Sequence, residues 1–232
     1  MLKQVFQTLV VLSFASSAFA QSGRSAMKQE NAEAPRDQFS SYVMKGFSAG
    51  LEYSSMMGDL QIKAKDPSTG TEFKVSGNTN EGAGALGVSV NYANLPRARA
   101  GYMVGLGVIN KVENDSNGKN TLKSSKGFSQ IRPEGNVGYA LSNGLWGMVG
   151  AHASLLTGGN ITDFAAPLGG GLQASVGYVP VRNLGFDIGY YITMHTLSDS
   201  GVKSIEESGL SVDKSESWMK ISQLRARAMY YF

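Results

Sequence analysis

Apolar and polar residues alternate along most of this chain. In the closing stretch "QLRARAMYYF", every second residue from Leu224 to Phe232 is apolar, while Arg225 and Arg227 fall on the opposite file. Successive side chains of a β-strand point to opposite faces of the sheet, so this stretch predicts one strand with an apolar side and a polar side. The same two-residue period governs the chain from about residue 45 onward.

Eight segments carry this period and are predicted as strands: 46–57, 82–92, 99–109, 128–141, 145–156, 170–179, 184–197 and 218–232. Most are at least as long as the roughly 9–11 residues with which a tilted strand crosses a bilayer. Between the first two, "QIKAK" and "EFKVS" flank the turn sequence "DPSTG". These pieces are expected to extend the two strands as a hairpin beyond the main sheet.

The connections between the segments alternate in length. Long polar connections at 58–81, 110–127, 157–169 and 198–216 are separated by short breaks such as "SNG" and "PVRN". A transmembrane barrel has short periplasmic turns at one end and longer external loops at the other. The pattern therefore predicts an all-β fold, an eight-stranded antiparallel up-and-down transmembrane β-barrel over residues 45–232. A soluble exported barrel with its apolar faces turned inward is the architectural alternative.

The distribution of charge favours the membrane-embedded arrangement. Most lysines lie outside the strands, and the polar strand faces consist mainly of Gly, Ser, Asn and Gln, as expected of a confined, hydrated lumen. Glycine accounts for 29 of the 232 residues and recurs within strands, which suggests an interior where large polar side chains need small neighbours. Lys220 is the main exception, and we expect it on the lipid side near the external end, where its long side chain can reach water.

Aromatic residues mark the ends of the predicted strands. Those near the short turns, where an interfacial girdle is expected, are Tyr92, Tyr102, Tyr139, Tyr178, Phe186, Tyr230 and Phe232. Phe128, Phe164 and Trp218 lie towards the opposite end.

The first 20 residues have the features of a secretory signal peptide. Lys3 precedes an apolar run that ends in Ala18-Phe19-Ala20, a small-x-small cleavage site before Gln21. We therefore expect export to the bacterial outer membrane with cleavage after Ala20, followed by a flexible periplasmic lead-in at 21–44. An uncleaved anchor is the alternative, but the apolar run is shorter than the roughly 20 residues of a spanning helix.

Composition excludes several classes of site. The chain has no cysteine, so neither disulfides nor thiolate metal ligands contribute. The net charge of +3 is modest, and no basic cluster with interleaved aromatic residues indicates nucleic-acid binding.

The signal peptide, the eight alternating strands, the loop lengths and the terminal "LRARAMYYF" resemble the small outer-membrane barrels of the OmpA/OmpX type over residues 45–232. This resemblance implies that the last strand is the signal read by the barrel-assembly machinery, with Leu224, Tyr230 and Phe232 matching its apolar alternation and final aromatic residue. The glycine often found in that signal is absent here, with Ala226 and Ala228 nearby instead. The resemblance concerns architecture, since fold does not imply function.

Six charged residues fall on the lumen-facing files of the predicted strands: Glu52, Arg132, Glu134, Asp187, Arg225 and Arg227. Closure of the barrel would place the last strand between the first and the seventh, with its arginines between Glu52 and Asp187. An eight-stranded barrel is just wide enough for side chains to fill. We therefore predict a structural cluster of ion pairs that plugs the lumen, with a gated ion path as the alternative.

The stretch "AHASLL" is the main catalytic candidate. His152 and Ser154 share one strand face, and some outer-membrane lipid A deacylases use an H-x-S pair of this spacing with an acidic partner. Here the pair is predicted to face the lumen rather than lipid, no acidic partner can be assigned, and His195 is not on an adjacent strand. We therefore predict no catalytic, cofactor-binding or metal-binding residues.

The favoured interpretation is a non-enzymatic outer-membrane barrel that gives envelope structure or displays extracellular loops for surface interaction. A narrow channel for ions or small solutes and a lipid A-modifying enzyme are the functional alternatives. The expected partners are outer-membrane lipid and lipopolysaccharide, the barrel-assembly machinery through the last strand, and any surface ligand that the long loops bind.

Overall fold

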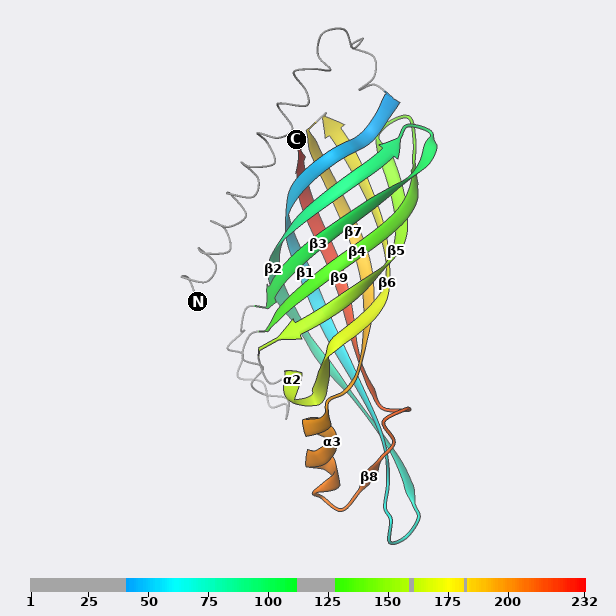
Figure 1. Cartoon of the computed structure of the whole chain (residues 1–232), viewed down its shortest axis with the longest axis vertical. Helices are drawn as coiled ribbons and strands as arrows, with labels where there is room; N and C mark the ends of the chain where they lie inside the picture. The colour runs from blue at the N-terminus through cyan, green and yellow to red at the C-terminus, as the bar shows by residue number, and fades with distance from the viewer. Residues whose placement is uncertain (1–40, 112–127, 159–160, 182) are drawn as a thin grey trace. The chain divides into compact units, whose positions relative to one another are not determined.

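A computed structural model of the chain describes residues 41–111, 128–158, 161–181 and 183–232. Eight long strands dominate it (Figure 1): β1 Tyr42–Lys65, β2 Glu72–Pro96, β3 Arg99–Lys111, β4 Ser129–Ala140, β5 Leu145–Thr157, β6 Ala165–Val181, β7 Leu184–Leu197 and β9 Trp218–Tyr231. Three short elements lie in the long connections: α2 Ile161–Phe164, α3 Asp199–Glu206 and β8 Ser211–Val212. None of the helices in this part of the chain has the length and apolarity needed to span a membrane.

The eight long strands close into a barrel. Each pairs antiparallel with its neighbours in sequence, and β9 pairs with both β7 and β1, which in turn pairs with β2. Arg227 is the register partner of Glu52 on one side and of Asp187 on the other. The predicted fold and the predicted place of the last strand are both confirmed.

Several strand boundaries differ from those expected. β1 begins at Tyr42, so its first residues come from the predicted lead-in, and β6 begins at Ala165, inside the predicted 157–169 loop. The first long connection is a regular extension of β1 and β2, paired from Gly58↔Thr79 to Lys65↔Glu72, as the hairpin prediction required. Residues 1–40, with the predicted signal peptide, and most of the loop 110–127 lie outside the described residues.

The apolar files face outward. Burial alternates along each strand, and β7 shows it without interruption. Leu51, Leu172 and Phe232 expose 71%, 70% and 67% of their surface, and Leu86, Val137, Val149 and Val176 are similarly exposed. Since a soluble barrel would turn these side chains inward, the exposed belt supports the membrane-embedded arrangement.

The lumen differs from the hydrated interior that the sequence suggested. Two apolar clusters fill its ends. The turn-end cluster comprises Val43, Met44, Ala93, Leu95, Met103, Ala140, Trp146, Met148, Met229 and Tyr231. The loop-end cluster comprises Met56, Ala85, Ile109, Phe128, Leu156, Ala165 and Ile221. Phe128 therefore packs inside the barrel instead of joining an outer girdle, and the six charged side chains lie between the two clusters.

The glycine run "GGG" at 169–171 makes room for two histidines. Gly169 and Gly171 face the lumen from β6, between His152 on β5 and His195 on β7. A Cβ at Gly171 would lie 2.9 Å from Cε1 of His152 and would also collide with the carbonyl group of Ile192. A Cβ at Gly169 would lie 2.5 Å from Cε1 of His195. These two glycines are required by close approach, because both imidazoles lie across β6.

We predict that Gly171→Ala lowers the free energy of unfolding by about 1–3 kcal/mol, because the added methyl group overpacks the lumen wall against His152 and Ile192. Urea unfolding of the detergent-solubilised protein would measure this. Gly135→Ala is the matched control, since a Cβ at Gly135 meets nothing within 4 Å. Equal stability of the two variants would contradict this account of the glycine run.

Candidate functional site

The six predicted lumen residues converge in one layer at the middle of the barrel. Glu52 from β1, Arg132 and Glu134 from β4, Asp187 from β7, and Arg225 and Arg227 from β9 are all at most 6% exposed. The layer contains three guanidinium groups and three carboxylates, so its formal charge is zero. A buried charge without a partner is costly, and this stoichiometry removes that cost.

Arg132 joins β4 to β1 and β9. Its Nη2 atom donates to both carboxylate oxygens of Glu52 at 3.2 Å. Its Nη1 atom donates to Oε1 of Gln223 at 3.1 Å, and its Nε atom lies 3.5 Å from Oε2 of Glu134. One guanidinium therefore crosses the lumen and ties three strands together.

The two arginines of β9 share one carboxylate from β7. Nη2 of Arg225 donates to Oδ1 of Asp187 at 2.9 Å, and Nε of Arg227 donates to Oδ2 of the same residue at 2.7 Å. Nη1 of Arg227 also donates to Oδ1 of Asn91 at 2.9 Å. These contacts fix the closing strand to β7 and to β2 across the lumen.

Glu134 and Tyr191 form the centre of the layer. Glu134 accepts from Arg227 at 3.2 Å, from Arg225 at 3.4 Å and from the Tyr191 hydroxyl at 3.0 Å. The Tyr191 ring also contacts two guanidinium groups, with the Cζ atoms of Arg132 and Arg225 at 4.3 and 4.6 Å from its centroid. Such cation–π contacts strengthen when water is excluded.

A neutral polar layer lies between the charged layer and the loop-end cluster. Nε2 of Gln223 donates to Oε1 of Gln130 at 2.6 Å, and Nε2 of Gln130 donates to Oγ of Ser154 at 2.7 Å. Nε2 of His152 lies 2.8 Å from Oγ1 of Thr193. His152 and Ser154 are thus held by separate partners inside the lumen.

Sequence reasoning placed Gln130 and Gln223 on polar strand faces but did not include them or Tyr191 in the predicted lumen cluster. Tyr191 has the same odd parity on β7 as Asp187, and Gln223 the same parity on β9 as Arg225. The two-residue period alone therefore indicated that Tyr191 and Gln223 face the lumen. Their participation depends on which strands face each other across the lumen, and a single strand does not carry that information.

Among the described residues, three of the long connections build a cap at the loop end of the barrel (Figure 1). β8 pairs with the end of β1 at Ala64 and Lys65. The loop before β9 also contacts the hairpin, since Nζ of Lys63 donates to Glu216 at 3.0 Å. At the other side, the Ser198 hydroxyl donates to the Asp163 carbonyl oxygen at 2.5 Å, which joins α3 to α2. The cap is an ordered structure in the described residues.

Two further charged contacts lie outside the lumen. Lys220 is on the outer file and pairs with Asp59 at 2.5 Å, an ion pair that neutralises it at the loop-end edge of the belt. In the cap, the hydrogen bond from Lys214 lowers the pKa of the Asp199 carboxyl. Within the described residues, no cluster of three or more His, Asp and Glu side chains is arranged to hold a metal ion.

The predicted assembly-signal residues lie on the outer surface of the closing strand and at the chain end. Leu224, Tyr230 and Phe232 expose 54%, 51% and 67% of their surface, and the Tyr230 and Phe232 rings meet edge-to-face at 5.5 Å. The lumen side of the same strand ends in Met229 and Tyr231, which are buried in the turn-end cluster.

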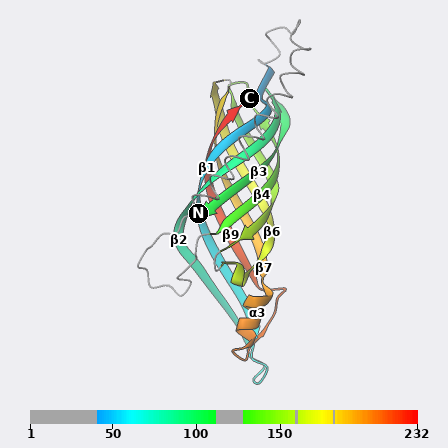
Figure 2. The same ribbon diagram turned by 60° about the vertical axis from the view of Figure 1, so that its left-hand side comes forward.

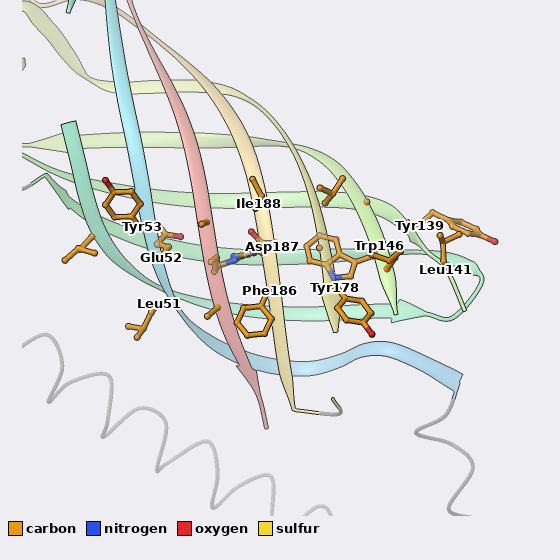
Figure 3. A pocket seen from close by; sticks show the side chains of 18 residues that line it. Leu51, Glu52, Tyr53, Tyr139, Leu141, Trp146, Tyr178, Phe186, Asp187 and Ile188 are labelled. Carbon is orange, nitrogen blue, oxygen red and sulfur yellow. Dashed lines mark hydrogen bonds and ion pairs between the residues drawn. The ribbon is translucent and has the colours of Figure 1, made fainter. Parts of the chain in front are cut away.

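One pocket, seen close up in Figure 3, is lined mainly by outward-facing apolar side chains and also by the lumen residues Glu52, Trp146, Asp187 and Arg227. Its volume is about 990 Å³. Ala226 and Ala228 line it together with larger side chains such as Leu51, Tyr53 and Phe186. The apolar part of its lining belongs to the exposed belt, so lipid is the expected neighbour of those side chains.

We predict that Arg225→Ala lowers the free energy of unfolding by about 3–5 kcal/mol, because Asp187 and Glu134 each lose a cation in a water-excluded layer. Urea unfolding in detergent would measure this, with Arg99→Ala as the control because Arg99 is exposed at a short turn. The variant should remain non-conducting in planar bilayers, since both apolar clusters still close the lumen. A stability loss no larger than that of Arg99→Ala would contradict the structural role of the layer.

Comparisons with known proteins find likeness in fold only. No protein-family model matches the chain, and no curated protein matches it. Among solved structures, Neisserial surface protein A (NspA) is 14% identical with a TM-score of 0.45, covering 81% of this chain and 98% of its own. The attachment invasion locus protein Ail of Yersinia pestis is 14% identical with a TM-score of 0.36, covering 82% and 100%. The outer membrane protein OprG of Pseudomonas aeruginosa is 11% identical with a TM-score of 0.38, covering 82% and 99%.

At such low identities and TM-scores, these likenesses assign no activity. The architecture follows from the chain's own geometry: eight antiparallel strands closed on themselves, an apolar outer belt, and long connections at one end with short turns at the other. The chain has the fold of the small eight-stranded outer-membrane β-barrels of the OmpA/OmpX type.

Proposed function

We propose that this chain is a closed, non-enzymatic barrel of the bacterial outer membrane that stabilises the envelope and presents an extracellular cap for contacts at the cell surface. One observation carries the proposal: in the described part of the chain, buried side chains occupy both ends and the middle of the lumen. A charge-balanced layer lies between the turn-end and loop-end apolar clusters, so the chemistry available to partners is concentrated in the cap.

The occupied lumen argues against the alternative that the protein is a channel for ions or small solutes. An ion would have to displace Trp146 and Met229 at one end, break the contacts of Arg227 in the middle, and displace Phe128 at the other end. Close-packed apolar side chains leave no path for water, and each buried ion pair is costly to open.

The position of the H-x-S pair argues against the alternative that the protein is a lipid-modifying enzyme. His152 and Ser154 are 6% and 0% exposed inside the barrel, whereas lipid lies outside it. The oxygens of Glu134, the nearest acid in register with His152, are taken by arginines and Tyr191. A hydrolase would need its nucleophile and base to reach the ester of a lipid.

For export and assembly, we propose cleavage after Ala20 and recognition of the last strand by the barrel-assembly machinery. Support comes from the outward position of Leu224, Tyr230 and Phe232, which leaves their side chains accessible to another protein or to lipid. The outer belt would contact outer-membrane lipid and, at its external edge, lipopolysaccharide.

We predict that the purified protein runs faster on unboiled than on boiled SDS gels and gives no discrete conductance in planar bilayers. The first result is expected of a closed barrel that resists detergent, and the second of an occluded lumen. Discrete current steps from a preparation that retains the gel shift would contradict the closed-lumen proposal in favour of a channel.

We predict that Phe232→Ala reduces the amount of protein in the outer-membrane fraction several-fold, because the final aromatic side chain is part of the assembly signal. Immunoblots of fractionated cells would measure this. Phe47→Ala is the matched control, since Phe47 is 50% exposed on the same outer belt but lies on the first strand. Equal losses in the two variants would assign the effect to the aromatic belt rather than to the signal.

A further inference from the structure

The β1–β2 hairpin leaves one strand edge open above the barrel. Beyond the barrel, one side of β1 pairs with β2, and the other side pairs with β9 up to Gln61 and with β8 at Ala64 and Lys65. β2 pairs with β3 only from Ala85 to Asn94. Among the described residues, no strand pairs with the outer edge of Glu72–Gly77 (Figure 2).

The backbone groups that point to this edge can be identified. The Lys63 N–H donates to Oγ of Ser217 at 2.9 Å, and its carbonyl oxygen accepts from the Asp213 N–H at 2.9 Å. Both groups therefore point away from β2. Lys74 is opposite Lys63, so this is a non-hydrogen-bonded pair, and the N–H and C=O of Lys74 point to the open edge. By the two-residue period, those of Glu72 and Ser76 do the same.

The side chains of this edge strand divide into two faces. Phe73 and Val75 share one face and are 43% and 60% exposed, although they lie outside the membrane belt. Glu72 and Lys74 share the other face; the Glu72 side chain is 61% exposed, and its Oε2 lies 3.7 Å from Nζ of Lys63 on β1. An exposed strand edge with apolar side chains is a template for pairing with another strand.

We propose that the Glu72–Gly77 edge pairs antiparallel with the same edge of a second copy of this protein, carried by a facing membrane and in a register centred on Phe73. This inference rests on the proposed function, because it requires the cap to lie outside the cell. The contact would make the protein a self-recognising link between two outer membranes.

Charge selects this register. Pairing can join only residues whose backbone groups point to the edge, namely Glu72, Lys74 and Ser76. The register centred on Phe73 places Glu72 of each copy opposite Lys74 of the other, forming two opposite-charge pairs. A register centred on Lys74 would place two lysines opposite each other, and one centred on Glu72 two glutamates. Opposite charges across strands stabilise, and like charges destabilise.

The same register satisfies the backbone and the apolar face. The N–H and C=O groups of Glu72 and Lys74 would exchange hydrogen bonds between the copies. Phe73 would lie opposite Phe73 in a non-hydrogen-bonded pair, where side chains approach most closely. Both exposed apolar residues of the edge would be covered.

Antiparallel pairing requires facing membranes. Two copies in one membrane point their hairpins in the same direction, which aligns the edges parallel and prevents both charge pairs from forming together. Copies in opposed membranes present the edges antiparallel. The hairpin is suited to such a contact because its tip extends past α3 and β8 (Figure 1).

The test is clustering of vesicles of phosphatidylethanolamine and phosphatidylglycerol that carry the full-length barrel. Two dye-labelled vesicle populations are mixed, and energy transfer between them reports contact. Wild-type vesicles should cluster. E72K and K74E vesicles should each lose clustering by about tenfold or more with themselves, because both charge pairs become like-charged. Mixing E72K vesicles with K74E vesicles should restore it, because opposite charges again face each other.

K203E and E206K in α3 are the matched controls, since they reverse exposed charges of the same cap away from the edge, and they should cluster like the wild type. The gel shift on heating is read from the same vesicles. Loss of the shift would count against the closed barrel itself. Three results with a retained gel shift would overturn this inference and leave the barrel proposal standing. They are the absence of wild-type clustering, clustering that E72K and K74E do not reduce, and no recovery of clustering in the mixed pair.

Discussion

The balance of buried charge around the closing strand is the constraint on which the rest of the structure depends. Arg225 and Arg227 enter the lumen on β9, between strands that supply Glu52 and Asp187. Three guanidinium groups are buried there with three carboxylates, and most of their contacts join strands far apart in the sequence. Because an uncompensated buried charge costs several kcal/mol, the layer is satisfied only when β1, β4, β7 and β9 are in register, and so it ties their register to closure.

The small residues and the apolar clusters follow from that layer. Large side chains crossing a narrow lumen need neighbours without side chains, and Gly169 and Gly171 fill that role below the two histidines. At both ends, methionine and aromatic side chains fill the irregular space that remains, and Met suits such gaps because it is flexible. The apolar clusters in turn exclude water from the ion pairs, which strengthens the electrostatic attraction within the layer.

Because the lumen is occupied by buried side chains, the polar groups accessible to a partner lie mainly at the loop end of the barrel. Contacts among the hairpin, β8 and α3 hold the described cap together. In the described residues they leave the Glu72–Gly77 edge of β2 without a strand partner, and this edge carries charges of both signs and exposed apolar side chains. The same interactions that close β1 against β8 and β9 also turn the backbone of Lys74 towards the open edge. The backbone groups accessible at this edge therefore follow from how β1 pairs with β8 and β9 at the loop end.

The alternation of apolar and polar residues determined the strand count, the barrel architecture and the inward direction of Glu52, Arg132 and Asp187, because the two-residue period is a local property of strands. Sequence also indicated the hairpin extension, through the turn residues of "DPSTG". Only the tertiary structure decided that Met229, Tyr231 and Phe128 close the lumen and that Tyr191 lies between two guanidinium groups. It also decided that β8 covers one edge of the hairpin, while no strand of the described residues covers the other. These features depend on which residues meet across the barrel, and that is set by register and closure, which no single strand encodes.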